Sequence, residues 1–477
     1  MKPLLHYSKK LAAKLGKEWM PFADVATVDL PLPRLLRLSL FQLSIGLATA
    51  LLVGTLNRVM IVELGVPAWW VALSVALPLV FAPMRALIGF RSDTHRSPLG
   101  LRRLPYMWMG SLLLFGGLAI MPFALLALAE PQPGMLWVGR IGASLAFLLV
   151  GAGMQITQTA GLALATDLAT PETRPRVVAL MYTMLLLGLV GSGAVFGWLL
   201  ADFSPFHLIQ VVQGSAVVVI WMNLAALWKQ EGRNAERAKA RFEKEKNNFA
   251  ASWRAFSERP GVKRFLWTVG AGTCAFNMQD IILEPYGGQI LHLDVGATSA
   301  LTALTAAGAL VAFAIAAKLL SRGADACRVA AAGALFGLPA FALVIFSAPL
   351  DAPNLFRAGA VLIGLGGGLF SVGTLTMAMD LQQGEDAGMA LGAWGAVQAT
   401  AAGLSIAAGG LIKDAVSALA TSGWLGESLI SPVTGYSFVY HIEMYVLFFV
   451  LIAIGPLVRR RNTPINTTRF GLAEFPS

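Results

Sequence analysis

Residues 229–248 read KQEGRNAERAKARFEKEKNN, a run in which side chains of both charges alternate with small and polar ones. The run belongs to the longest polar stretch of the chain, residues 229–263, and long apolar stretches flank it on both sides. An apolar stretch of about 18 residues or more can cross the hydrocarbon core, and it must do so as a helix, because lipid cannot satisfy backbone hydrogen bonds. The polar stretch therefore predicts a linker between two groups of membrane helices.

The composition excludes an ordinary soluble protein. Of 477 residues, 56% are hydrophobic and 13% are charged, whereas soluble domains carry about 25% charged residues. The net charge of +10 is concentrated in predicted loops and tails, so it indicates membrane topology and no nucleic-acid partner. The two cysteines, Cys274 and Cys327, form neither a disulfide framework nor a metal-binding spacing. We expect no signal peptide, because no apolar segment precedes Pro33.

We predict an all-α integral membrane protein of twelve transmembrane helices, six on each side of the linker. Orientation follows from the distribution of Lys and Arg, which favour cytoplasmic loops. If the N-terminus is cytoplasmic, all but five of the 36 basic residues fall on the cytoplasmic side, the exceptions being Arg58, Arg85, Arg140, Arg357 and Lys413. Both termini are therefore predicted to be cytoplasmic. The predicted helices span residues 36–57, 67–90, 105–129, 135–160, 176–200, 206–228, 264–286, 296–318, 329–349, 354–378, 387–410 and 437–458.

The predicted domains follow from these helices. Residues 1–34 form a cytoplasmic N-terminal segment, and residues 459–477 form a cytoplasmic tail. Two six-helix halves, 35–228 and 264–458, enclose the linker 229–263. Within residues 4–22, Tyr7, Leu11, Leu15 and Trp19 recur every four residues opposite a lysine-rich face, which is typical of a helix lying on anionic lipid. The alternative is a frayed basic tail.

This arrangement resembles the major facilitator fold, which consists of two related six-helix halves. Two short motifs agree with it: Ala165-Thr-Asp-Leu168 and Ala378-Met-Asp-Leu381 occupy matching places in the two halves. A Gly-x-x-x-Asp motif followed by basic residues after the second helix is a signature of the same fold. We expect a gating or structural role at the cytoplasmic face for Gly89, Asp93, Arg102, Arg103, Asp167 and Asp380.

Ionisable side chains inside the membrane are candidates for functional sites. Arg58, Arg85 and Arg140 lie close enough to the predicted helix ends to extend their charges to the interface, so they are assigned a structural or gating role. Asp280 and Glu284 lie deeper, in a predicted helix that Pro285 and the following glycines should end. Their spacing of four residues places both carboxyl groups on one helix face.

The two acids permit two interpretations. They form a binding site together with Gln279, or they form an ion-pair lock between the halves with Arg58 and Arg140, which lie at a similar depth. Other polar side chains within helices are either helix–helix hydrogen bonders or ligands: Gln155, Gln158, Trp394, Gln398 and His441. No metal cluster, nucleotide-binding loop or Ser-His-Asp set occurs in the sequence, so we expect no enzyme activity.

Four segments resemble the PucC/LhaA family of phototrophic bacteria, a branch of the major facilitator superfamily. They are Arg85–Ser97 with Arg102–Tyr106, Pro175–Tyr182, Gln279–Gly288 and the glycine-rich run Gly364–Met377. Leu101 stands where the family pattern has Trp. The resemblance implies a chaperone-like role in assembling light-harvesting complexes, the core antenna rather than the peripheral one, in the bacterial inner (intracytoplasmic photosynthetic) membrane.

The resemblance also implies a cofactor and partners. The cofactor would be bacteriochlorophyll, with carotenoid or lipid as further candidates. The partners would be the antenna α and β polypeptides, the reaction-centre core, bacteriochlorophyll synthase, the membrane insertion machinery and membrane lipids. Gln398 or His441 could supply the axial ligand of the chlorin magnesium, with the amides of Gln155 and Gln158 as further choices. The alternative function is a secondary transporter of a porphyrin-like or other small solute, which the nearly uncharged membrane midplane disfavours for polar solutes.

Overall fold

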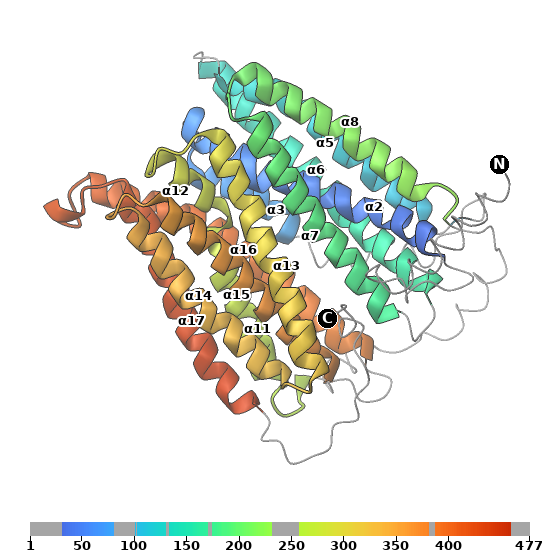
Figure 1. Ribbon diagram of the computed structural model, residues 1–477. Coiled ribbons are helices and arrows are strands. Elements are labelled where there is room, and N and C mark those ends of the chain that lie inside the picture. Colours follow the sequence, from blue (N-terminus) through green and yellow to red (C-terminus); the bar gives the residue numbers. More distant parts are fainter. Residues whose placement is uncertain are drawn as a thin grey trace, which may run out of the picture.

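The computed structural model describes residues 31–80, 101, 103–129, 133–169, 174–230, 257–380 and 387–458, and every regular element in these ranges is a helix (Figure 1). Before the linker the helices are α2 (Leu32–Thr49), η2 (Ala50–Leu56), η3 (Val59–Glu63), α3 (Ala68–Val80), α5 (Leu104–Ala129), α6 (Pro133–Leu168), α7 (Arg174–Leu199) and α8 (Pro205–Leu227). After it come α11 (Val262–Asn277), η4 (Met278–Ile281), α12 (Leu283–Gln289), α13 (Val295–Ser321), α14 (Ala326–Ser347), α15 (Pro353–Asp380), α16 (Ala387–Thr421), η6 (Glu427–Leu429), α17 (Val433–Ile454) and η7 (Gly455–Leu457).

Several predicted features lie outside these residues. They are the lipid-surface helix at 4–22, the residues Arg85, Gly89, Asp93 and Arg102, the linker residues 231–256 and the tail. The side chain of Asp380 is outside as well. The domain boundaries, the orientation of the termini and the roles of these residues therefore stay predictions.

The structure confirms a multi-pass membrane protein. Ten of the described helical segments are long and apolar enough to cross a membrane. Large apolar side chains face outward from them, among them Trp198, Trp221 and Trp267, each more than half exposed. Outward-facing apolar side chains on this scale are expected where lipid is the solvent. Two of the twelve predicted helices are not among the ten: α3, which is a shorter apolar helix, and the interrupted segment α11–α12. The count of twelve stays a prediction.

Three helices are longer than predicted by ten residues or more. The first is continuous from Leu32 to Glu63 and contains the π-helical turns η2 and η3. Its end was placed too early because Arg58 looked like an interface residue, yet Arg58 is buried and forms an ion pair with Glu63. The fourth predicted helix extends to Leu168 as α6, and the eleventh to Thr421 as α16. In α16, Lys413 and Asp414 pair at 3.1 Å, so their charges do not end the helix.

The predicted helix 264–286 is interrupted. After α11 ends at Asn277, the 3-10 turn η4 leads into the short helix α12. The prediction that Pro285 ends the helix is wrong, because Pro285 lies in the first turn of α12. A proline is tolerated there, since the first N–H groups of a helix have no intrahelical acceptor. Asp280 and Glu284 therefore sit on different elements, and the predicted shared helix face is wrong.

The helices before and after the linker meet along two seams, α3 against α16 and α7 against α13 (Figure 1). Glycines allow this approach: Gly410 of α16 lies against Ala68 and Ala72 of α3, and Gly193 of α7 lies against Ala303 of α13. A side chain at either glycine would collide with the facing helix. Small residues at such contacts are the usual basis of helix packing in membranes.

Candidate functional site

Three acidic side chains from distant parts of the chain converge inside the bundle. Asp280 comes from η4, Glu284 from α12 and Glu443 from α17. The Asp280 carboxyl group interacts electrostatically with both glutamates. Glu284 is 4% exposed and Glu443 is fully buried. We call these three residues the acidic cluster.

The interruption of α11–α12 positions two of the three acids. Asp280 Oδ1 accepts a hydrogen bond from Gln279 Nε2 at 2.6 Å, and Glu284 Oε1 accepts one from Thr302 Oγ1 of α13 at 3.1 Å. Asn57 from the first helix donates to the Asp280 backbone carbonyl at 3.4 Å. The cluster therefore joins helices from both sides of the linker.

Several acceptor atoms of the cluster are buried without a hydrogen-bond partner in the part of the chain that the structure describes. They are Glu284 Oε2, both carboxyl oxygens of Glu443 and the neighbouring Gln279 Oε1. Buried polar atoms are nearly always paired, and leaving a carboxylate unpaired is costly. This arrangement is suited to accept hydrogen-bond donors or positive charge from a bound species. Among the described residues, however, no group of His, Cys, Asp and Glu has the geometry to hold a metal ion.

Three tyrosines pack against one another near the acidic cluster, and one of them, Tyr440, interacts electrostatically with Glu284 and Glu443. The ring of Tyr286 lies 5.4 Å from that of Tyr436 and 5.7 Å from that of Tyr440, centroid to centroid. Tyr286 Oη donates to the Val344 carbonyl at 3.1 Å, and Tyr436 Oη donates to Gln289 Oε1 at 2.6 Å. The Tyr440 hydroxyl is buried and unpaired among the described residues. It is therefore free to donate a hydrogen bond to a species bound at the acidic cluster.

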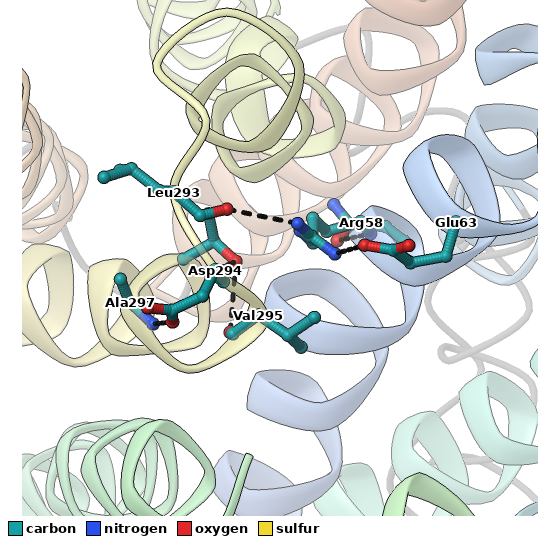
Figure 2. Close-up of polar contacts among 8 residues, drawn as sticks. Arg58, Glu63, Leu293, Asp294, Val295 and Ala297 are labelled. Atoms are coloured by element: carbon teal, nitrogen blue, oxygen red, sulfur yellow. Dashed lines mark hydrogen bonds and ion pairs between the residues drawn. The ribbon is translucent and has the colours of Figure 1, made fainter. Parts of the chain in front are cut away.

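The predicted ion-pair lock does not form. Arg58 pairs with Glu63 and donates to the Leu293 carbonyl at 3.1 Å, so it does not pair with Asp280 or Glu284 (Figure 2). It still links the two sides of the linker, because Leu293 precedes α13. The Arg140 guanidinium lies over the rings of Trp70 and Trp137, at 5.9 and 5.5 Å from their centroids, a cation–π arrangement. Both arginines therefore have partners other than the two acids, although Arg58 Nε and Arg140 Nε have no hydrogen-bond acceptor among the described residues.

The other predicted residues lie in separate surroundings. Trp394 Nε1 donates to Thr374 Oγ1 at 3.2 Å, and Gln158 Nε2 donates to Gln42 Oε1 at 3.4 Å. These two contacts are helix–helix hydrogen bonds, one of the two interpretations left open by the sequence. The remaining members are the half-buried Gln398, Gln155 with a buried unpaired Oε1, and His441, which is exposed and has its Nδ1 2.7 Å from the Ser437 carbonyl.

Two predicted signature residues do meet. Arg103 Nη2 forms an ion pair with Asp167 Oδ2 at 3.2 Å, with the arginine side chain buried. This contact joins the start of α5 to the end of α6, as a structural lock would.

Sequence reasoning missed Glu443. A signal was present, because Glu443 is the single acidic residue within the predicted helix 437–458. Only the packing of α17 against η4 shows that it joins Asp280.

The helical arrangement is that of known membrane transporters. A bacterial homologue of the iron transporter ferroportin, in an inward-facing state, has a TM-score of 0.64 at 14% identity over 89% of this chain and 98% of that one. A bacterial homologue of the human lysosomal transporter Spinster has a TM-score of 0.62 at 14% identity over 88% and 94%. The chain therefore has the major facilitator fold.

Within that fold the chain belongs to the PUCC protein family, whose sequence profile matches residues 55–462. An uncharacterized protein of the puhA-bchM intergenic region of Rhodobacter capsulatus is 51% identical over 98% of this chain and 99% of its own length. Protein PucC of Rhodovulum sulfidophilum is 53% identical over 85% and 90%. The bacteriochlorophyll synthase 44.5 kDa chain of R. capsulatus is 28% identical over 92% and 98%. The predicted family is confirmed.

Proposed function

We propose that this protein is an assembly factor for photosynthetic antenna complexes, which handles or delivers bacteriochlorophyll to light-harvesting polypeptides, the core antenna in particular. The observation that carries the proposal is the full-length similarity to PUCC family proteins, which covers both groups of helices. A relative of similar length is named as a bacteriochlorophyll synthase chain. These relatives support a role related to photosynthetic complexes, and the photosynthetic membrane and pigment handling are our extensions of it.

The chemistry of the bundle supports an assembly role better than catalysis. Bacteriochlorophyll and antenna helices are both apolar and reside in the bilayer, so a protein that brings them together must present apolar surfaces to lipid. The exposed tryptophans of α7, α8 and α11 do so. We propose as partners the antenna α and β polypeptides, the reaction-centre core, bacteriochlorophyll synthase and the insertion machinery, with no enzymatic activity of its own.

The chlorin magnesium needs one axial ligand from the protein or from water. His441 fits this requirement, because its Nδ1 lies 2.7 Å from the Ser437 carbonyl, so that a proton on Nδ1 leaves the lone pair on Nε2 for a metal. The side chain is also exposed on α17. Gln398 is half-buried on α16 and offers a weaker carbonyl ligand.

The acidic cluster favours a second candidate function, secondary transport of a porphyrin-like or other small solute. Ionisable groups buried within a membrane bundle commonly mark ion or proton pathways. Here Glu284 and Glu443 carry unpaired buried oxygens where helices from both sides of the linker meet. Antenna assembly and solute movement predict different properties of the purified protein.

One purification separates the two candidates. The full chain is isolated in mild detergent, and its absorption spectrum and co-purifying polypeptides are recorded. The assembly function predicts bound bacteriochlorophyll and antenna polypeptides. Absence of both, together with solute uptake by proteoliposomes containing the protein, would exclude it in favour of transport.

A further inference from the structure

A groove opens between α7 and α8 on the side of the bundle away from the acidic cluster's helices. Both helices pack on α2, which forms the floor, while they scarcely touch each other (Figure 1). The groove has a volume of about 780 Å³, within the range of about 300–1,000 Å³ typical of small-molecule sites. Its walls are mostly apolar, and several wall residues, such as Leu187, Val195 and Val218, are exposed. A ligand could therefore enter from the lipid.

Two glycines create part of this space. A Cβ atom added at Gly191 of α7 or Gly214 of α8 would have no neighbour within 4 Å. Gly188, one turn from Gly191, is different, because its Cβ would collide with the backbone of Leu43. Gly188 thus serves helix packing, whereas Gly191 and Gly214 leave room on facing walls.

Two serines place hydroxyl groups in the groove. Ser192 is 9% exposed and Ser215 is 5% exposed, and both line it. A serine inside a helix can satisfy its hydroxyl on a carbonyl one turn earlier, as Ser74 does with Trp70. Ser192 and Ser215 have no hydrogen-bond partner anywhere in the described ranges. Their hydroxyls are therefore free to donate to carbonyl oxygens of a ligand.

His207 lies at one end of the groove with its ring held by the backbone. Ser204 caps the start of α8 by accepting from the His207 N–H at 3.1 Å. The ring Nδ1 lies 3.1 Å from the Asp202 carbonyl. Because a carbonyl can only accept, Nδ1 carries the proton, and the lone pair of neutral His207 is on Nε2. A metal-binding histidine is commonly oriented by such a bond from its other nitrogen.

We propose that this groove binds a magnesium chlorin with a hydrocarbon tail, with His207 Nε2 as the axial ligand. An apolar macrocycle suits the walls, its carbonyl groups suit the two free hydroxyls, and a tail can lie along the open side that faces lipid. A phospholipid acyl chain would use neither a nitrogen lone pair nor the two buried donors. The assignment rests on the proposed function and locates its pigment site.

The test is titration of the purified full-length protein with bacteriochlorophyll a, followed by absorption and visible circular dichroism. Gly214→Leu adds a side chain to the groove at a position whose Cβ would have no neighbour within 4 Å, so it should weaken pigment binding by about tenfold or more. Gly116→Leu is the matched control, since Gly116 of α5 also has no neighbour within 4 Å of its Cβ position, and it should bind as the wild type does.

A second pair tests the ligand. His207→Ala should weaken binding by about 10- to 100-fold and change the chlorin absorption bands, and added imidazole should restore the bands. His292→Ala is its control, because that side chain is also exposed and does not line the groove, whereas His441→Ala tests the other candidate ligand. Wild-type binding by both Gly214→Leu and His207→Ala would overturn the groove while leaving pigment handling intact, as would a spectral change confined to His441→Ala. If Gly214→Leu alters only the co-purifying phospholipid, the groove is a lipid site and the proposal fails. If the wild type binds no pigment, both this proposal and pigment handling fail.

Discussion

At the scale of single residues, the unusual feature is a set of carboxyl groups that are buried without cationic partners in the part of the chain that the structure describes. Glu443 has neither oxygen paired among the described residues, and Glu284 has one unpaired. The nearby cations are engaged elsewhere: Arg58 with Glu63, and Lys413 with Asp414. Groups that cost stability and are nevertheless present commonly serve a function. The sequence indicated Asp280 and Glu284, but their relation to Glu443 depends on long-range packing that no local pattern contains.

Replacing Glu443 by Gln should stabilise the purified protein while reducing function. The amide is nearly the same shape and removes a buried acid whose oxygens lack donors, so the gain should be about 1 kcal/mol or more. A higher midpoint of thermal unfolding in detergent, together with lower antenna content in cells, is the expected result. A lower midpoint would show that Glu443 has a stabilising partner and contradict this account.

Asp280→Asn should impair antenna assembly and leave membrane insertion intact. The substitution keeps the side chain's size but removes the carboxylate that interacts with both glutamates. Antenna absorption of whole cells measures assembly, and immunoblotting of membranes measures insertion. Asp294→Asn is the control, because Asp294 caps α13 by accepting from the Ala297 N–H, a role that asparagine can also fill. Normal antenna levels in Asp280→Asn would show that the carboxylate is dispensable.

At the scale of elements, apolar length decides most of the helices, and this is why the sequence predicts them. What it could not predict is where a helix is interrupted by its tertiary surroundings. The segment around Pro285 resembles a helix end, yet the chain begins the new helix α12 there. Likewise Arg58 and Lys413 resemble helix ends only until their partners, Glu63 and Asp414, are known. The hydropathy of a single segment does not show whether a charged residue has an ion-pair partner inside the bundle.

Two neighbouring glycines of α7 should respond oppositely to the same substitution. Gly193→Leu would force a side chain into the backbone of Ala303 on α13 and should destabilise the protein by about 2 kcal/mol or more. The Cβ atom of Gly191→Leu would have no neighbour within 4 Å, so this variant should unfold at the wild-type temperature. Thermal unfolding in detergent measures both. Equal effects of the two substitutions would contradict the α7–α13 seam.

At the scale of the whole molecule, the sequence predicted an all-helical membrane protein of the major facilitator fold, and the structure and relatives confirm it. The site was only partly predictable. Local spacing identified the acids of α11–α12, but it paired them with Arg58 and Arg140, which have other partners. Depth along separate helices cannot reveal which side chains meet, since that depends on how the helices rotate and pack.

The predicted orientation is open to a direct check. Alkaline phosphatase, which is active only outside the cytoplasm, should be inactive when fused after Ser477 or within the linker at residue 240. It should be active when fused within the segment that follows α16, at Gly423. Activity at residue 240 would contradict a cytoplasmic linker and the distribution of basic residues from which it was inferred.

The most direct test of the account is transfer of pigment. The purified protein, loaded with bacteriochlorophyll, is mixed with pigment-free antenna α and β polypeptides in liposomes, and the antenna absorption band is followed over time. We predict that the band forms faster than with the same amount of free bacteriochlorophyll, and that Asp280→Asn removes the advantage. Equal rates with protein-bound and free pigment would contradict the claim that this protein delivers bacteriochlorophyll to the antenna.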